Sequence, residues 1–306
     1  MQDLVRKGLL LRLVGEGGNV GWGEIAPLPP CSVESLGEAT EQIIALLPLL
    51  LTEQRVPETL FPSVSFGVES ALADLRRAVP VRPPLVCALI TDLLAPPEIC
   101  AKRIEGYRAA KIKVGCHPLD KEISALSTLL SLLPRETEVL VDANGSWSLE
   151  EGCRFAEAFP PSTFSFFEEP LRRFEDYVRF PHPFALDETV RALPGSAYLE
   201  LPLLRGMVIK PTMTGGPTRL LPSALSAKQR GIRLYLSSSY ESALGLSRIA
   251  QMAEELSLPD IPMGIGTLDP TEDSLFEEEI EVEGGRWLFP SYYTLKDPVI
   301  VVHEER

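Results

Sequence analysis

From about residue 84 onward, short apolar runs alternate with longer amphipathic stretches. This alternation is typical of the βα units that build a parallel sheet. The apolar runs predict eight strands, the last of which is the weakest: Leu85–Ile90, Ala110–Val114, Val139–Ala143, Phe164–Phe167, Phe184–Leu186, Gly206–Ile209, Arg233–Leu236 and Ile261–Gly264. The amphipathic stretches predict helices at Pro97–Tyr107, Leu119–Leu133, Leu149–Phe159, Thr218–Arg230 and Glu241–Leu256.

Eight strands with intervening helices suit a closed β/α barrel better than most open sheets. A doubly wound open sheet is the alternative, but no GxGxxG motif follows the first strand. Two of the predicted helices have good start signals. Ser148 precedes Glu150 and Glu151, and Ser242 precedes an apolar-periodic run.

Residues 1–82 have a different pattern. Leu9–Val14 and Trp22–Ile25 predict a hairpin, which helices near Ser35–Leu51 and Ser65–Ala78 follow. The tail returns to strand and turn residues at Glu277–Trp287 and at 299–303. We therefore expect an N-terminal α+β module (1–82), a barrel (83–270) and a C-terminal segment (271–306) that packs back onto the first module.

Composition narrows the class of protein. The chain is 45% hydrophobic and 24% charged, as globular domains are. The apolar stretch Ile43–Leu51 is too short to span a bilayer and Pro48 interrupts it, and the N-terminus lacks the features of a secretory signal. The net charge is −14 without a basic cluster, which argues against a nucleic-acid partner. We expect a cytoplasmic protein with a small-molecule substrate, no membrane partner and an oligomeric state that the sequence does not reveal.

The cysteines and histidines of the chain indicate that its chemistry rests on other residue types. Five cysteines are scattered without a CxxC pair, which favours reduced thiols over disulfides or zinc. Because the chain has only three histidines, its chemistry is expected to rest on carboxylates and lysines.

Two lysines lie on one predicted strand. In the run Ala110–Val114, the period of two directs Lys111 and Lys113 to the same face. One face of a barrel strand is interior, where two lysines are costly unless they serve a function. The alternative is that both point outward and extend past the helices.

Three carboxylates end the next three strands. Asp142 precedes Glu168 by 26 residues, and Glu168 precedes Asp187 by 19, about one βα unit each time. The three groups should therefore converge on one mouth of the barrel. An all-oxygen set without His or Cys favours a hard cation, Mg²⁺ before Mn²⁺ or Ca²⁺. The alternative is that each carboxylate caps its own helix.

The following strands supply further polar groups. Lys210 comes 23 residues after Asp187 and should reach the mouth from the side opposite the first two lysines. Ser237 opens a Ser-Ser-Ser run that could bind a substrate carboxylate, although a serine-rich turn before the next helix would look the same.

Lysines beside a hard-cation site suit the removal of a proton next to a carboxylate, which creates an enediolate. A cation neutralises the new charge, while a lysine whose pKa is lowered by neighbouring cations accepts the proton. Lys113 is closer to the strand end than Lys111, so Lys113 is the predicted base.

The motifs KIKVG, VDANGSW, FFEEP, ALDET, VIKPT and SSSYESALGL, in this order, resemble the enolase superfamily in its muconate-lactonising subgroup, and most closely the o-succinylbenzoate synthase family. GLLLRL and GWGEIAPLP look like the family's capping domain, so the resemblance spans nearly the whole chain. It implies a modified (β/α)7β TIM-type barrel under an α+β capping domain. Family members carry another strand and a lid loop before the segment matching Leu9–Val14, where this chain has eight residues.

The resemblance also implies an activity: the Mg²⁺-dependent syn dehydration of 2-succinyl-6-hydroxy-2,4-cyclohexadiene-1-carboxylate by a carbon–oxygen hydro-lyase of menaquinone or phylloquinone biosynthesis. The roles implied by motif place the metal on Asp142, Glu168 and Asp187, proton transfer on Lys113, charge stabilisation on Lys210, substrate contact on Ser237, and support on Lys111 and Asn144. Mn²⁺ is a possible substitute for Mg²⁺.

Three alternatives remain at this point. Lys113 and Lys210, on opposite sides, would also serve an N-succinylamino acid racemase or a dipeptide epimerase. A lysine could instead be the nucleophile of a Schiff-base aldolase. The third alternative is a barrel that binds a ligand without catalysis, which is disfavoured because none of the metal or lysine positions is lost.

Overall fold

The computed structural model describes residues 6–52, 57, 59–76, 82–192, 197–268, 275–296 and 303–304. Seven parallel strands form one sheet in sequence order: β3 Cys87–Ile90, β4 Ala109–Lys113, β5 Glu138–Asp142, β6 Phe167–Glu168, β7 Phe184–Leu186, β8 Leu204–Ile209 and β9 Arg233–Leu236. The helices between and after them are α3 Pro97–Ile104, α4 Leu119–Leu132, α5 Leu149–Glu157, α6 Glu188–Ala192, α7 Pro211–Thr214, α8 Pro217–Gln229 and α9 Ala243–Glu255, with short 3-10 helices at Phe174–Asp176 and Ala197–Glu200.

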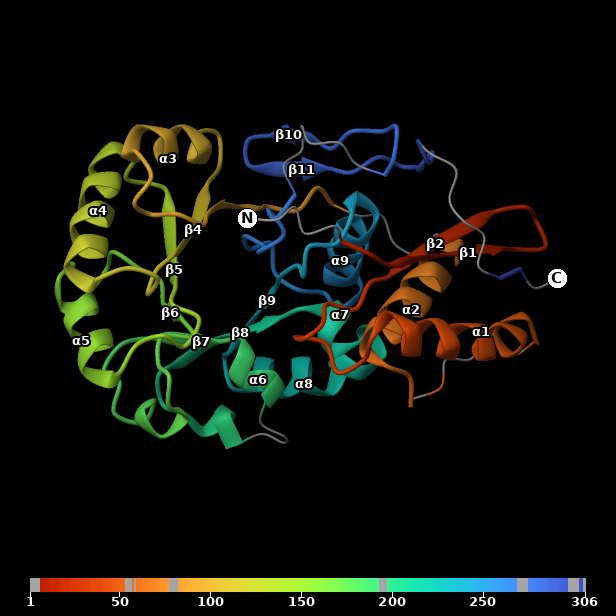
Figure 1. Ribbon diagram of the computed structural model, residues 1–306, viewed down its shortest axis with the longest axis horizontal. Coiled ribbons are helices and arrows are strands. Elements are labelled where there is room, and N and C mark those ends of the chain that lie inside the picture. Colours follow the sequence, from red (N-terminus) through yellow and green to blue (C-terminus); the bar gives the residue numbers. More distant parts are fainter. Residues whose placement is uncertain are drawn as a thin grey trace.

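The sheet curls, and its helices lie on the outside of the curve, as Figure 1 shows for α3, α4 and α5. This is the arrangement of a TIM-type barrel. The segment around Met263 connects the two ends of the sheet. The Met263 N–H donates to Leu85 O and its carbonyl accepts from Cys87 N, both at 2.9 Å, while Gly264 N donates to Leu236 O at 2.9 Å.

The prediction of a regular eighth strand over Ile261–Gly264 was wrong, because only Met263 and Gly264 form bridges. Pro262, directly before them, has no N–H to donate to a ladder. The predicted strand Phe164–Phe167 was also placed too early. Strand β6 begins at Phe167, and Phe164 lies before it with its ring 5.2 Å from that of Phe159.

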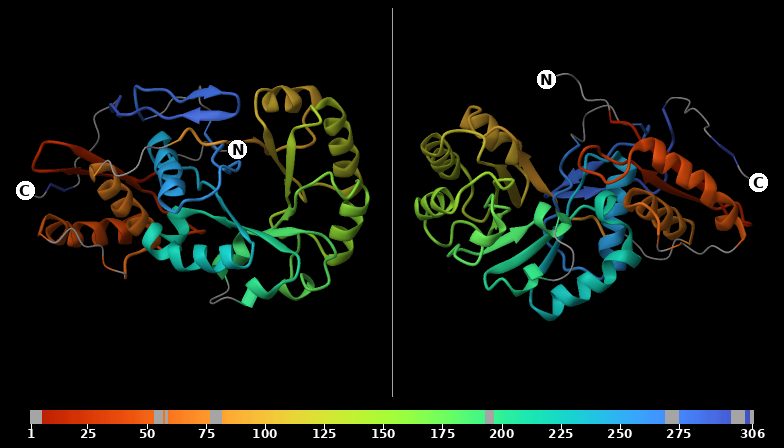
Figure 2. Two further views of the ribbon diagram at one scale, coloured as in Figure 1. Left: turned by 180° about the vertical axis from the view of Figure 1, so that it is seen from behind. Right: turned by 60° about the horizontal axis from the view of Figure 1, so that its bottom comes forward.

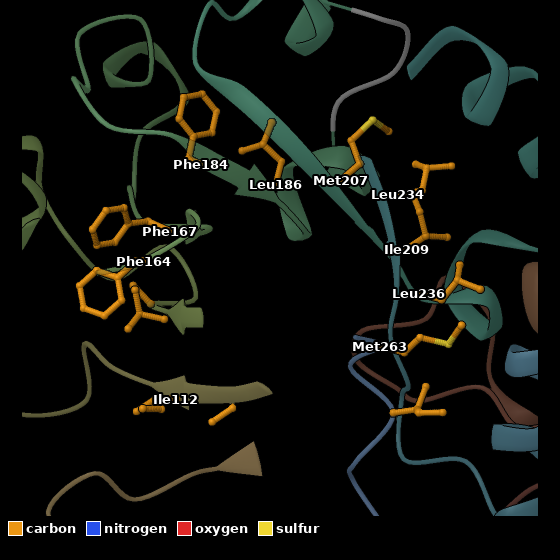
Figure 3. Packing of buried hydrophobic residues seen from close by; sticks show 14 of the residues in the cluster. Ile112, Phe164, Phe167, Phe184, Leu186, Met207, Ile209, Leu234, Leu236 and Met263 are labelled. Carbon is orange, nitrogen blue, oxygen red and sulfur yellow. The ribbon is translucent and has the colours of Figure 1, made fainter. Parts of the chain in front are cut away.

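Side chains alternate between two cores along the strands. The inward residues form one cluster inside the barrel: Cys87, Ala109, Leu140, Phe166, Ala185, Val208 and Tyr235. Their neighbours in sequence, such as Ala110, Phe167 and Ile209, face outward and belong to a larger core shared with the helices. Figure 3 shows outward residues following the curve of the strands. Alternation with a period of two therefore determines which residues reach the barrel interior.

Both predicted helix starts were confirmed, but only one of them has a side-chain cap hydrogen bond. Ser148 accepts from Glu151 N and forms a capping box that starts α5. Ser242 occupies the cap position of α9, but its side chain makes no cap hydrogen bond and its hydroxyl donates to Glu24 instead.

The N-terminal residues form a separate cluster. An antiparallel hairpin of β1 Leu9–Val14 and β2 Val20–Ile25 packs against α1 Leu36–Thr52 and α2 Pro62–Arg76, and their buried side chains make a core distinct from those of the barrel. Figures 1 and 2 place these elements beside α7 and α9. The predicted helix end at Ala78 lies outside the described residues.

The tail forms a second hairpin, β10 Glu281–Glu283 with β11 Arg286–Leu288. It lies against the chain that leads into β3, where Trp287 N donates to Pro84 O at 3.1 Å, and Trp287 joins the core of the barrel helices. The predicted strand at 299–303 falls largely outside the described residues. No described helix has the length and apolarity needed to cross a membrane.

Candidate active site

Every charged residue of the predicted site comes two positions after an inward-facing residue of its strand. Asp142 follows Leu140 in this way, Glu168 follows Phe166, and Lys210 follows Val208. The barrel alternation therefore carries these side chains to the inside at the carboxyl ends of the strands.

The two lysines of β4 share a face, as predicted. The Nζ atom of Lys111 lies 2.9 Å from Asp142 Oδ2 and that of Lys113 lies 2.7 Å from the same oxygen. Ile112 between them is fully buried on the outer side of the strand. The alternative in which both lysines point outward past the helices is wrong.

The three carboxylates are deeply buried, with exposed fractions of 0% for Asp142, 2% for Glu168 and 1% for Asp187. Each pairs with a lysine. Lys111 bridges Asp142 and Glu168, and Lys210, from the far side of the sheet, pairs with Asp187. The six predicted groups thus form two sets of ion pairs, one on β4, β5 and β6 and one between Asp187 and Lys210.

Burial and charge shift the protonation equilibria of these groups. Burial opposes ionisation of Asp142, but Lys111 and Lys113 outweigh it and hold the pKa of that carboxyl well below its ordinary value. Burial, reinforced by Asp142, raises the pKa of Glu168 to about 8. Burial alone would lower the pKa of Lys111, yet the surrounding carboxylates raise it well above its usual value. The mouth of the barrel can therefore accept further positive charge at Glu168.

The donor set fits a hard cation. All three carboxylates offer oxygen, and Asp187 Oδ1 is buried without a hydrogen-bond partner in the described structure. As placed, no three His, Cys, Asp or Glu side chains of the described residues are grouped to hold one ion, and lysine ammonium groups lie against the carboxylates instead. A bound cation would therefore replace part of these ion pairs.

The two predicted supporting residues also lie at the site. Asn144 Oδ1 accepts from Lys113 Nζ at 2.7 Å, and its Nδ2 donates to Glu188 Oε1 at 3.2 Å. Ser237 is buried at the end of β9, where its hydroxyl donates to Gly264 O at 3.0 Å. Contact between Ser237 and a substrate stays a prediction.

Several carboxylates that fix the loops around the site were missed. Glu241 accepts from Thr212 Oγ1 and from Ser239 N, both at 2.5 Å, and so joins the chain segments that follow β8 and β9. Glu122 is fully buried and accepts from three consecutive N–H groups at 115–117, after Lys113. Glu122 carries no motif beyond its position in a helix, whereas Glu241 lies within the SSSYESALGL motif, which was the available signal for it.

Comparisons with known proteins agree on one group. Residues 2–75 match the family described as "MenC, N-terminal domain", and residues 98–292 match "Enolase C-terminal domain-like". The o-succinylbenzoate synthase of Edwardsiella ictaluri is 36% identical over 274 residues, which cover 86% of this chain and 83% of that protein.

Solved structures of members of this group are similar to the chain. The o-succinylbenzoate synthase of Thermosynechococcus elongatus, determined with Mg in its active site, is 28% identical, with a TM-score of 0.66 over 86% of this chain and 85% of that one. The muconate lactonizing enzyme of Pseudomonas putida is 21% identical, with a TM-score of 0.74 over 95% and 92% of the two chains, which shows a shared fold.

Proposed function

The chain belongs to the o-succinylbenzoate synthase family of the enolase superfamily, and on that premise we propose that it dehydrates 2-succinyl-6-hydroxy-2,4-cyclohexadiene-1-carboxylate to o-succinylbenzoate. The observation that carries the proposal is the convergence of Lys113, Lys210 and three buried carboxylates at one barrel mouth. The reaction is a step of menaquinone or phylloquinone biosynthesis.

Lys113 is the proposed acid–base residue. Its side chain is 26% exposed, whereas that of Lys111 is 9% exposed, so Lys113 is the lysine of the pair that a substrate can reach. Its Nζ atom would take the proton from the carbon next to the substrate carboxylate. The same nitrogen would then return that proton to the departing hydroxyl, which leaves as water on the same face.

The other two lysines have supporting roles in this proposal. Lys210 lies across the site, and its ammonium group would stabilise the negative charge that develops on the substrate carboxylate oxygens. Lys111 keeps Asp142 and Glu168 together through its two ion pairs. Asn144 orients the Nζ atom of Lys113.

We propose Asp142, Glu168 and Asp187 as ligands of Mg²⁺, with Mn²⁺ as a possible substitute. The support is the all-oxygen donor set and the buried Oδ1 of Asp187, which accepts no hydrogen bond from the described residues and has the Arg191 guanidinium 3.9 Å away. When bound, the cation would act as a Lewis acid on the substrate carboxylate.

We also propose a finer description of the fold. Residues 83–270 would form a (β/α)7β barrel, because six of the seven strands are followed by an α-helix and β6 by a short 3-10 helix, and residues 263–264 bridge β9 to the start of β3. Residues 1–82 would form the capping domain, which their separate core supports. Residues 271–306 would return to it. A cytoplasmic location is consistent with five free cysteines.

A second activity is worth testing because Lys113 ends β4 and Lys210 directly follows β8, and three strands, β5 to β7, lie between β4 and β8 in the sheet. Acid–base groups on two faces are what the racemisation of an N-succinylamino acid or the epimerisation of a dipeptide needs. Purified protein with Mg²⁺ would be assayed on the cyclohexadiene acid and on N-succinylamino acids. We expect faster turnover of the cyclohexadiene acid; racemisation without any aromatic product would reject the dehydratase proposal.

A further inference from the structure

We propose that Glu169, next to the proposed ligand Glu168, is a positioning residue that holds the backbone of Asp187 and joins the three carboxylate-bearing strand ends. This inference rests on the metal site proposed above and adds a residue that does not touch the metal or the substrate. Glu169 is 3% exposed, so its carboxylate is buried with its partners.

The side chain of Glu169 takes the place of one backbone hydrogen-bond acceptor of the sheet. The ladder between β6 and β7 ends where Glu168 pairs with Ala185. In a regular parallel ladder the next N–H, that of Asp187, would bind a backbone carbonyl of β6. It donates instead to Glu169 Oε2 at 2.6 Å.

The backbone of Glu169 explains this replacement. Its φ angle is +36°, in the left-handed region that a residue with a side chain rarely adopts. The turn directs the Glu169 carbonyl to the neighbouring loop, where it accepts from Gly145 N at 2.6 Å. Glu169 therefore contacts the loop after Asp142 through its backbone and the loop at Asp187 through its side chain, and it is covalently joined to Glu168.

Four donors surround the Glu169 carboxylate, in two distinct sets. The Oε2 atom accepts from two backbone N–H groups, Asp187 at 2.6 Å and Thr189 at 3.3 Å. The Oε1 atom faces two hydroxyls, that of Thr189 and that of Tyr177 at 3.2 Å. Backbone N–H groups can only donate, whereas hydroxyls can also accept.

This difference predicts unequal effects of two substitutions. In Glu169→Gln the amide oxygen can take the Oε2 position and the amide nitrogen can donate to both hydroxyls, so the backbone N–H groups of Asp187 and Thr189 keep their acceptor. In Glu169→Ala the N–H of Asp187 loses its partner, and the loop that carries the Asp187 carboxylate is no longer held. Loss of a residue that orients a metal ligand typically weakens metal binding by about 10- to 100-fold.

The experiment is a calorimetric titration of Mg²⁺ into the metal-free full-length protein and its variants. We expect wild type and Glu169→Gln to bind with similar affinity and Glu169→Ala to bind about 10- to 100-fold more weakly. Glu157→Ala, which removes an exposed carboxylate on α5, is the matched control and should bind as wild type does. Asp187→Asn serves as the reference for loss of a ligand.

If Glu169→Ala does not give a folded protein by circular dichroism, Glu169→Asp replaces it. That variant retains the charge, but its shorter side chain cannot reach Asp187 N, so it should weaken binding as well. Equal Mg²⁺ affinity of wild type and the folded variant would overturn the inference while leaving the proposed function intact. Absence of Mg²⁺ binding to wild type, or unchanged binding to Asp187→Asn, would overturn the proposed metal site and this inference together.

Discussion

Lys111 and Lys113 bind the same oxygen of Asp142 but differ in what else surrounds them. Lys111 is enclosed by carboxylates that raise its pKa well above the usual value, so it stays protonated. Among the described residues, Lys113 donates hydrogen bonds to Asp142 and Asn144, and its side chain is more exposed than that of Lys111. Two lysines two residues apart are therefore suited to different tasks, a fixed cation and a proton carrier.

Replacement of Lys113 by alanine tests this division. Removal of a general acid–base group typically costs about 10²- to 10⁴-fold in rate, and we expect a loss of kcat in this range for Lys113→Ala. Lys121→Ala, which removes an exposed lysine on α4, should leave kcat unchanged. The measurement is steady-state kinetics with the cyclohexadiene acid. Comparable kcat values for the two variants would assign proton transfer to another group.

Sequence reasoning was effective for residues whose position follows from the strand period. The shared face of Lys111 and Lys113 and the convergence of Asp142 with Glu168 follow from the period of two and the length of a βα unit. It could not identify the function of Glu169, because that depends on a left-handed backbone angle and on the place where a ladder ends. Neither quantity has a signature in the residue types.

At the scale of elements, the N-terminal hairpin is tied to the barrel by a buried carboxylate. Glu24, near the end of β2, accepts from Ser242 N at 3.2 Å and from Gly245 N at 3.1 Å at the start of α9. A second tie is the ion pair of Arg248 on α9 with Asp74 on α2, at 2.9 Å. These contacts fix the N-terminal elements beside the segment that contains Ser237.

The buried state of Glu24 predicts a pH dependence of stability. Burial raises its pKa above the ordinary value of 4.5. The Glu24 carboxyl therefore binds a proton more tightly in the folded protein than in the unfolded chain. Its contribution to the free energy of unfolding is fully present below pH 4.5 and is lost as the pH rises through the pKa of the folded state. Glu24→Gln lacks this titration.

Thermal unfolding of wild type and Glu24→Gln across this pH range measures the effect. We expect the Tm of wild type to fall relative to that of Glu24→Gln as the pH rises, whereas Glu16→Gln, in the exposed hairpin turn, should follow wild type. Parallel curves for wild type and Glu24→Gln would show that burial of Glu24 does not raise its pKa.

Helix α2 packs on β2 at a distance that only glycine permits. A Cβ atom on Gly23 would lie 1.9 Å from the carbonyl oxygen of Gly67. We expect Gly23→Ala to lower the free energy of unfolding by about 1–3 kcal/mol, as overpacking does. In Gly17→Ala the nearest atom would be 3.7 Å away, so that variant is the control for the general effect of alanine. Urea unfolding compares the two, and equal midpoints would refute the close contact.

At the scale of the whole molecule, the order of the strands and the place of the closing segment were predictable, whereas the extent of that segment was not. Seven strands in sequence order follow from apolar runs spaced by amphipathic helices. The predicted closing strand Ile261–Gly264 is reduced to two bridged residues, because Pro262 directly before them has no N–H to donate. The capping role of residues 1–82 and the return of residues 271–306 stay predictions.

The central claim is that one barrel mouth combines a lysine base with a divalent-cation site for α-proton removal. The most direct test follows the ultraviolet spectrum of the cyclohexadiene acid with purified protein, first with Mg²⁺ and then with EDTA. The account predicts that the aromatic spectrum of o-succinylbenzoate appears with Mg²⁺ and that EDTA abolishes its formation. A cyclohexadiene spectrum that stays unchanged with Mg²⁺, or aromatic product formed equally fast in EDTA, would contradict it.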